Sequence, residues 1–261
     1  MLKLGYTSYM TQGGDWGFFI TRAMGLLYPS HCKVGHLNAC EAYPPSPISH
    51  PYLYLQDKLT TYTPHEQAGV AQTEQHLRKG RGYEIIQNTR PQTLGYALTD
   101  SPVGLLGWIH EKMITWTDGY EWTDDEILTW VSIYYFSVAG PTASLRIYYE
   151  AQHDSHTDDN RDRVEDASGV SRGDVKPTRR HVDYETLMRW IPHVKYGISQ
   201  FPKDISVLPD TWASTLGDVV CQWRNDAGGH FASIEKPDVI VNNLREMMGP
   251  GGKCEGLIPL Q

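Results

Sequence analysis

The hydrophobic pattern near the N-terminus changes from that of a strand to that of a helix and back to a strand. Residues 6–12 carry the Tyr and Thr side chains typical of a buried strand, and residues 18–28 place apolar side chains at helical spacing before Pro29. Residues 33–38 resemble a second short strand. This order is typical of a parallel sheet covered by helices, which displays functional side chains at the carboxyl ends of its strands.

A Pro-rich stretch at residues 43–47 interrupts this pattern, because proline continues neither a helix nor a central strand. The sequence beyond it is mainly helical, and N-capping Ser or Thr residues mark three helix starts at Thr63, Ser101 and Thr123. We therefore expect residues 46–152 to form a helical lid inserted between two segments of the core, residues 1–45 and 181–261.

Residues 153–180 are almost wholly polar, with too little apolar surface to offset the entropy that ordering a chain costs. We expect a solvated loop there, and its aspartates lack the spacing of a calcium-binding loop, so no metal site is predicted. Residues 194–201 and 218–223 are predicted as two late strands, and residues 237–248 as a terminal amphipathic helix. This alternation of strands and helices predicts an α/β protein.

Composition and charge narrow the classes of partner. The 261 residues are 40% hydrophobic, enough for a packed core, and their net charge of -8 opposes binding to the phosphate backbone of a nucleic acid. The four cysteines show neither zinc-site spacing nor a disulfide framework, which fits a reducing compartment. No apolar run approaches the ~20 residues of a membrane span, and no signal peptide is recognised. We expect a cytoplasmic protein without a membrane segment, a nucleic-acid partner or a cofactor.

The sequence Gly-Gly-Asp-Trp-Gly at residues 13–17 stands between the first predicted strand and the helix that follows it. A strand that runs into Gly-x-nucleophile-x-Gly and then a helix forms a nucleophile elbow, in which the glycines let the turn tighten. The central residue is Asp15, and a carboxylate attacks an electrophilic carbon to give an alkyl ester that water then hydrolyses. This chemistry favours an epoxide or an alkyl halide over an acyl group. Asp15 equally suits the N-cap of the helix, and the motif alone leaves both roles open.

The sequence Gly-Gly-His-Phe-Ala at residues 228–232 follows the second late strand and supplies a candidate base, His230. The order nucleophile, acid and histidine along the chain is that of α/β hydrolases. The acid is expected after the preceding strand, where Asp204 would orient His230 and stabilise its imidazolium form. Asp210 and Asp218 are the nearest alternatives for the acid, and a turn or helix cap is the alternative role of Asp204.

Together the two motifs resemble those of epoxide hydrolases, in particular the microsomal-type and fungal branch, and the resemblance covers nearly the whole chain. It implies an α/β-hydrolase fold, of which this chain holds a partial core, the C-terminal half of a mostly parallel sheet, with an inserted helical lid. In this family two lid tyrosines donate hydrogen bonds to the epoxide oxygen. The flanking residues Arg-Gly-Tyr-Glu-Ile-Ile-Gln and Leu-Arg-Ile-Tyr-Tyr-Glu assign these roles to Tyr83, and to Tyr148 rather than Tyr149.

The resemblance further implies that a small-molecule epoxide and water are converted to a vicinal diol. Asp15 would form the alkyl ester, the backbone N–H of Trp16 would bind one side of the oxyanion, and His230 would activate the water. A haloalkane dehalogenase also combines an Asp-Trp elbow with an acid and a histidine, and it is the alternative enzyme, although the tyrosine segments count against it. A homo-oligomer is left open.

The second oxyanion donor of this family lies in a His-Gly-x-Pro loop after an early strand, and neither His36 nor His65 matches such a loop. The elbow lies where the family has already contributed half of its sheet. We therefore expect a chain that is truncated at its N-terminus and whose first strand, residues 6–12, lies at an exposed edge of the sheet. A catalytically inactive remnant, or an accessory subunit that pairs with another polypeptide, is the alternative of a different class.

Overall fold

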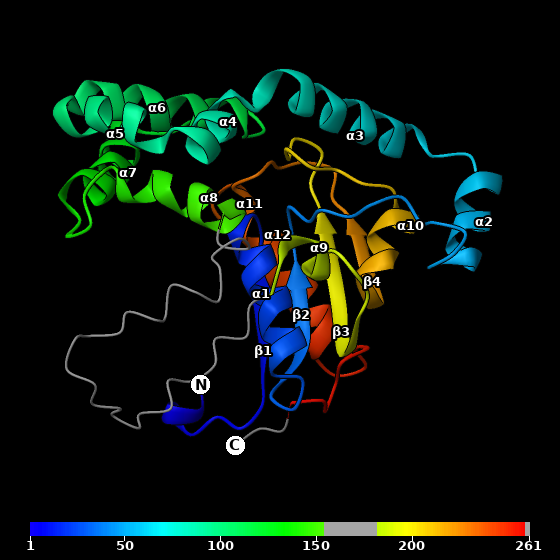
Figure 1. The fold of residues 1–261 in the computed structure, drawn as a ribbon. Helices are drawn as coiled ribbons and strands as arrows, with labels where there is room; N and C mark the ends of the chain where they lie inside the picture. The colour runs from blue at the N-terminus through cyan, green and yellow to red at the C-terminus, as the bar shows by residue number, and fades with distance from the viewer. Residues whose placement is uncertain (154–181, 259–261) are drawn as a thin grey trace, which may run out of the picture. The chain divides into compact units, whose positions relative to one another are not determined.

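The computed structural model describes residues 1–153 and 182–258, within which four parallel strands form one sheet in the order β1-β2-β3-β4 (Figure 1). The strands are β1 (Tyr9–Gly13), β2 (Cys32–Leu37), β3 (Ile191–Gln200) and β4 (Gly217–Arg224). In the described part of the chain β1 pairs only with β2, so it lies at an edge of the sheet. The predicted α/β fold class is confirmed.

The chain divides into two compact units, one that contains the sheet and one that is helical where it is described. The sheet unit comprises Met1–Gly80, His110–Trp122 and Tyr184–Gln261, and the helical unit comprises Arg81–Ile109 and Thr123–Asp183. The helices of the sheet unit are α1 (Trp16–Leu27), α2 (Pro51–Leu59), α3 (Pro64–Gln75), α9 (Tyr184–Leu187), α10 (Asp210–Ala213), α11 (Ala232–Glu235) and α12 (Pro237–Met248). Those that begin in the helical unit are α4 (Gly82–Thr89), α5 (Pro91–Asp100), α6 (Pro102–Thr115), α7 (Asp124–Phe136) and α8 (Ala143–His153).

Residues 46–80 group with the sheet in this division, whereas the sequence pattern placed them in the lid. Hydrogen bonds explain the grouping, because Asp57 of α2 accepts from the Thr211 hydroxyl at 2.7 Å and Thr73 of α3 accepts from the Val207 backbone N–H at 2.9 Å. The expected segment boundaries remain predictions. The polar loop expected at 153–180 lies outside the described residues, except for its first residue, which ends α8.

Helix α1 shares a buried core with the sheet. Phe18 of α1 packs in one cluster with Leu37 of β2 and Tyr196 of β3, each fully buried. Burial of a side chain of this size contributes about 1.5–3 kcal/mol, which holds α1 against β2 and β3. Gly35 makes room for the Tyr196 ring, because a Cβ at Gly35 would lie 2.7 Å from that ring.

Local signals set several element boundaries. Capping boxes formed by Thr63 with Glu66 and by Thr123 with Glu126 begin α3 and α7, as predicted, and α12 has the predicted bounds. The first strand begins at Tyr9 rather than at residue 6, because pairing with β2 starts only there.

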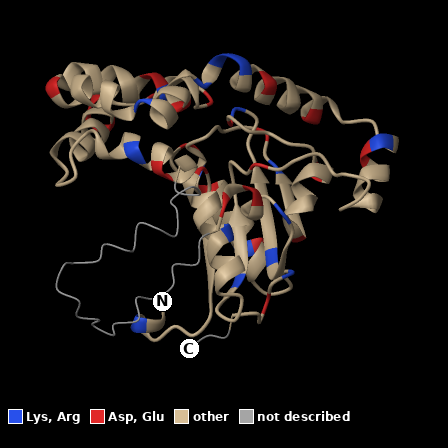
Figure 2. Ribbon diagram, viewed as in Figure 1, with Lys and Arg blue, Asp and Glu red and all other residues tan. Residues whose placement is uncertain are grey.

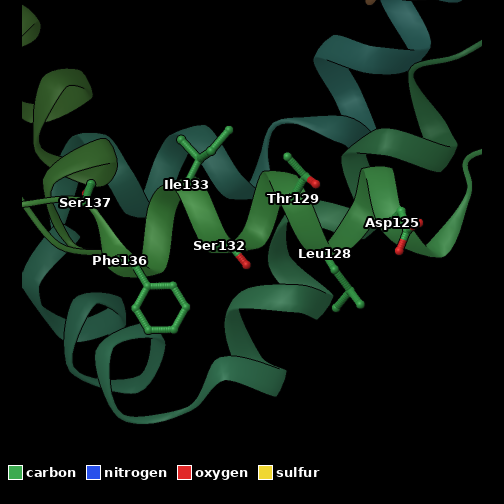
Figure 3. Close-up of a pocket in the computed structure, with 7 residues that line it drawn as sticks. All are labelled: Asp125, Leu128, Thr129, Ser132, Ile133, Phe136 and Ser137. Atoms are coloured by element: carbon green, nitrogen blue, oxygen red, sulfur yellow. The ribbon is translucent and has the colours of Figure 1, made fainter.

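The helical unit has its own small core, to which four helices contribute one buried side chain each: Leu98, Leu105, Val131 and Leu145. A shallow hollow lies along α7, where Leu128, Ile133 and Phe136 are exposed (Figure 3). None of the predicted site residues lines this hollow. Residues of both charge signs are distributed along the helices and the strands (Figure 2). No helix in the described residues is both long and apolar enough to span a bilayer.

A buried polar network joins the sheet to α12. Nε2 of His36 on β2 lies 2.8 Å from Oγ of Ser199 on β3, and the same oxygen accepts a hydrogen bond from Asn243 of α12 at 2.8 Å. No carboxylate takes part in these bonds. Burial therefore lowers the pKa of His36 from 6.5 to about 4.

We predict that His36 makes the protein acid-sensitive. Because the pKa is lower in the folded state, its contribution to stability is complete above about pH 6.5 and is lost as the pH falls toward 4. The loss amounts to about 3 kcal/mol of the free energy of unfolding. Chemical denaturation at pH 7.5 and pH 4.5 should show a smaller acid loss in His36→Gln than in the wild type. Equal losses in the two proteins would contradict this assignment.

Candidate active site

Asp15 lies in the tight turn between β1 and α1. Its backbone has φ 54° and ψ −125°, a conformation that is rare for a residue with a side chain and that indicates stored strain. Glycines on the strand side permit the turn, since a Cβ at Gly13 would lie 2.4 Å from the carbonyl oxygen of Gly17, and one at Gly14 would lie 2.6 Å from Nδ2 of Asn38. The turn lifts the Asp15 carboxylate to the carboxyl end of the sheet.

The two oxygens of Asp15 have different partners. Oδ1 accepts a hydrogen bond from the backbone N–H of Trp16 at 2.5 Å, which caps α1. Oδ2 lies 3.0 Å from Nε2 of His230. The two roles that the sequence left open for Asp15, helix cap and reactive carboxylate, are therefore compatible.

The other ring nitrogen of His230 faces Asp204. Nδ1 of His230 lies 2.8 Å from Oδ1 of Asp204, a carboxylate oxygen that also accepts the backbone N–H of Ile205 at 2.7 Å. Asp204 is almost fully buried, with 1% of its side chain exposed, and His230 is 6% exposed. The structure thus brings Asp15, His230 and Asp204 together from positions after β1, β4 and β3.

The two other acids that the sequence offered have different partners. Asp210 accepts a hydrogen bond from Arg224 at 2.6 Å, and Asp218 accepts one from Lys195 at 2.9 Å. Of the three acids, Asp204 is the one that His230 contacts.

Charge at this site favours an ion pair. Burial opposes a charge on His230, but the Asp204 carboxylate and the hydrogen bonds to both acids outweigh it and raise the pKa of His230 to about 10. Burial would raise the pKa of Asp15, but the bond to His230 and its charge, together with the Trp16 N–H, lower it. At neutral pH Asp15 is a carboxylate and His230 an imidazolium.

Trp116 is a neighbour of this site that sequence reasoning missed. Its carbonyl oxygen accepts the backbone N–H of His230 at 2.7 Å, and its ring lies edge-on to the imidazole with centroids 5.1 Å apart. It follows α6 and is 114 positions away from His230 in the chain. No local motif around Trp116 indicates this contact.

Tyr83 and Tyr148 lie together in the helical unit. Tyr83 is on α4 and Tyr148 on α8, both half-buried, with their rings edge to face and centroids 6.0 Å apart. Tyr149 instead stacks on His153 at 4.0 Å. The structure therefore pairs the two tyrosines that the flanking sequence selected.

Within residues 1–153 and 182–258, no group of three or more His, Cys, Asp or Glu side chains is placed to hold a metal ion.

Replacing Asp204 with Asn should lower the pKa of His230, because the Asp204 charge is the largest of the contributions that raise it. Titration of the imidazole by NMR should show the wild-type ring protonated to about pH 10 and the Asp204→Asn ring losing its proton at a lower pH. Asp210→Asn is the matched control, since Asp210 pairs with Arg224. The same His230 titration in both variants would contradict the geometry.

Known epoxide hydrolases are similar to this chain in sequence. A protein of Stigmatella aurantiaca named "Putative epoxide hydrolase" is 33% identical in an alignment of 254 positions that covers 94% of this chain and 48% of that protein. Epoxide hydrolase 1 of Sus scrofa is 30% identical in an alignment of 270 positions that covers 95% of this chain and 52% of that protein. No protein-family model matches the chain.

Solved structures of epoxide hydrolases are similar to this chain in fold. The Aspergillus niger epoxide hydrolase is 29% identical with a TM-score of 0.67, over 94% of this chain and 53% of that one. The juvenile hormone epoxide hydrolase of the silkworm Bombyx mori is 25% identical with a TM-score of 0.70, over 94% of this chain and 55% of that one. The chain spans about half the length of these relatives, and its sheet forms part of an α/β-hydrolase core. By sequence and by fold, the chain is related to the epoxide hydrolases of the α/β-hydrolase fold.

Proposed function

We propose that the protein is an epoxide hydrolase that opens a small-molecule epoxide to a vicinal diol through an alkyl ester on Asp15. The observation that carries this proposal is the contact of His230 with both carboxylates, Asp15 at 3.0 Å and Asp204 at 2.8 Å. A strained carboxylate beside an imidazole that a second acid orients is the arrangement that nucleophilic attack followed by ester hydrolysis needs.

In the proposed first step, Oδ2 of Asp15 attacks a ring carbon of the epoxide and the carbon–oxygen bond breaks. Oδ1 stays bound to the Trp16 N–H, which leaves Oδ2 as the nucleophile. The ring oxygen develops negative charge, and the phenol hydroxyls of Tyr83 and Tyr148 donate hydrogen bonds to it. Donors aimed at developing charge contribute several kcal/mol in a site that excludes water.

Ester formation changes the protonation of His230. The Asp15 carboxylate contributes to the raised pKa of His230, and an alkyl ester carries no charge. The pKa of His230 therefore falls once Asp15 is alkylated, and the ring oxygen takes up the proton that the imidazolium gives up. The neutral imidazole is then able to act as a base.

In the proposed second step, His230 takes a proton from a water molecule that attacks the Asp15 carbonyl carbon. The oxyanion forms on Oδ1, where the Trp16 N–H already donates a hydrogen bond. Cleavage of the ester releases the diol and returns Asp15 to a carboxylate and His230 to an imidazolium. The oxygen of the attacking water remains in Asp15, and the second proton of that water passes to the departing diol oxygen. Protons and oxygens therefore balance over the cycle.

The test of the function compares two substrate classes. The purified protein, incubated with styrene oxide and separately with a bromoalkane, should form a diol and release no bromide. Release of bromide without diol would instead favour a dehalogenase, and no turnover of either would favour an inactive relative or an accessory subunit. Repeated turnover in heavy-oxygen water should place the label in the peptide that contains Asp15.

His230→Gln should let the ester on Asp15 accumulate, because the Asp15 carboxylate can still attack and solvent can supply the proton to the ring oxygen, whereas hydrolysis of the ester needs the base. Mass spectrometry of the peptide that contains Asp15 should find the adduct after incubation with the epoxide. Asp15→Ala should show neither adduct nor turnover, and His65→Gln, at the start of α3, serves as the control that turns over normally. If His230→Gln also blocks ester formation, the role of His230 is misassigned.

Tyr83→Phe and Tyr148→Phe should each slow ester formation, at least roughly tenfold, because each removes one donor to the ring oxygen. Rapid-quench measurement of the adduct separates this step from hydrolysis, which we expect to change little. Tyr149→Phe is the matched control, since Tyr149 stacks on His153. Wild-type alkylation in the Tyr83→Phe, Tyr148→Phe double variant would remove both tyrosines from the site.

A further inference from the structure

We propose that Asp118 and Glu235 are positioning residues that hold the loop carrying His230. This inference rests on the proposed role of His230 as the base. The loop, residues 228–231, ends the connection from β4 to α11, and Glu235 is the last residue of that short helix. Asp118 lies far away in the sequence, just beyond α6.

Both carboxylates accept backbone N–H groups of the loop, and Glu235 also accepts the backbone N–H of Asp118. Asp118 Oδ2 accepts the N–H of Gly228 at 2.8 Å, and Glu235 Oε1 accepts the N–H of Gly229 at 3.1 Å. Glu235 Oε2 accepts the N–H of Asp118 at 2.7 Å. These hydrogen bonds link the two glycines directly before His230 to Asp118 and Glu235, and they link Asp118 to Glu235.

The segment that carries Asp118 packs tightly against the loop. A Cβ at Gly229 would lie 2.4 Å from the carbonyl oxygen of Trp116 and 3.0 Å from Cα of Thr117, so only glycine fits there. The Trp116 carbonyl also accepts the His230 N–H at 2.7 Å. Three consecutive N–H groups, at 228, 229 and 230, are therefore fixed by side-chain or backbone oxygens of residues 116–118 and 235.

Asp118 and Glu235 act through the backbone rather than through their charge. The carboxylates that raise the pKa of His230 are Asp204 and Asp15. Burial raises the pKa of Glu235, and the Asp118 carboxylate adds to this, while the backbone N–H groups of Asp118, Gly229 and Phe231 oppose it. Loss of either acceptor should therefore displace the imidazole from Asp15 and Asp204. A displacement of about 1 Å costs on the order of a hundredfold in rate.

Substitutions that keep or remove the acceptor test this role. Asp118→Asn keeps an oxygen for the Gly228 N–H, whereas Asp118→Ala removes it, and Glu235→Gln leaves one acceptor oxygen for two N–H groups. Asp226→Asn, an exposed change close to the loop, is the matched control. We expect Asp118→Ala and Glu235→Gln to slow hydrolysis of the Asp15 ester by roughly tenfold to a hundredfold. Ester formation should change much less, and Asp118→Asn should restore the hydrolysis rate.

Two readouts do not require turnover. In Asp118→Ala and Glu235→Gln, amide hydrogen exchange at Gly228, Gly229 and His230 should speed up, and the His230 imidazole should lose its proton at a lower pH than in the wild type. Unchanged exchange and titration would overturn the proposal. Equal slowing of both half-reactions together with a lowered melting temperature would also overturn it, as a general loss of stability. If the wild type turns over no epoxide, the proposed function fails, while these two readouts still decide the positioning role.

Discussion

An imidazole held between two carboxylates is the interaction on which the candidate site depends. His230 contacts Asp15 through one ring nitrogen and Asp204 through the other, and the three residues follow β4, β1 and β3. Parallel strands end at the same edge of a sheet, so this topology brings together residues as much as 215 positions apart. Within the described residues β1 and β4 lie at opposite edges of the sheet, so the loop after β4 is what carries His230 to Asp15.

The tight turn at Asp15 also positions its carboxylate toward His230. The residue ends the turn after β1 as the N-cap of α1, and its φ of 54° is held by close packing of the neighbouring glycines. A carboxylate has two oxygens, so capping occupies one and leaves the other for His230. Helix capping therefore orients the reactive oxygen instead of competing with it. Sequence alone offers the two roles as alternatives because it shows the residue type and not the direction of each oxygen.

The sequence predicted those features that neighbouring residues along the chain determine. The capping boxes at Thr63 and Thr123 and the bounds of α12 follow from neighbouring residues, and the structure has them as predicted. The partner of His230 required the fold, because Asp204, Asp210 and Asp218 are the same residue type. Tertiary contacts alone assign Asp210 to Arg224 and Asp218 to Lys195. The segment around Trp116 and Asp118 left no signal, since its contacts with the loop at 228–230 depend on packing between distant segments.

Two histidines of the same unit show that partners, and not burial, decide the charge. Both His36 and His230 are buried, and burial by itself lowers the pKa of a histidine. His36 contacts the neutral hydroxyl of Ser199, and burial lowers its pKa to about 4. His230 contacts the carboxylates of Asp204 and Asp15, which raise its pKa to about 10. Asp204 and Asp15 both favour the imidazolium at the site, so a reaction that neutralises Asp15 would lower the pKa of His230.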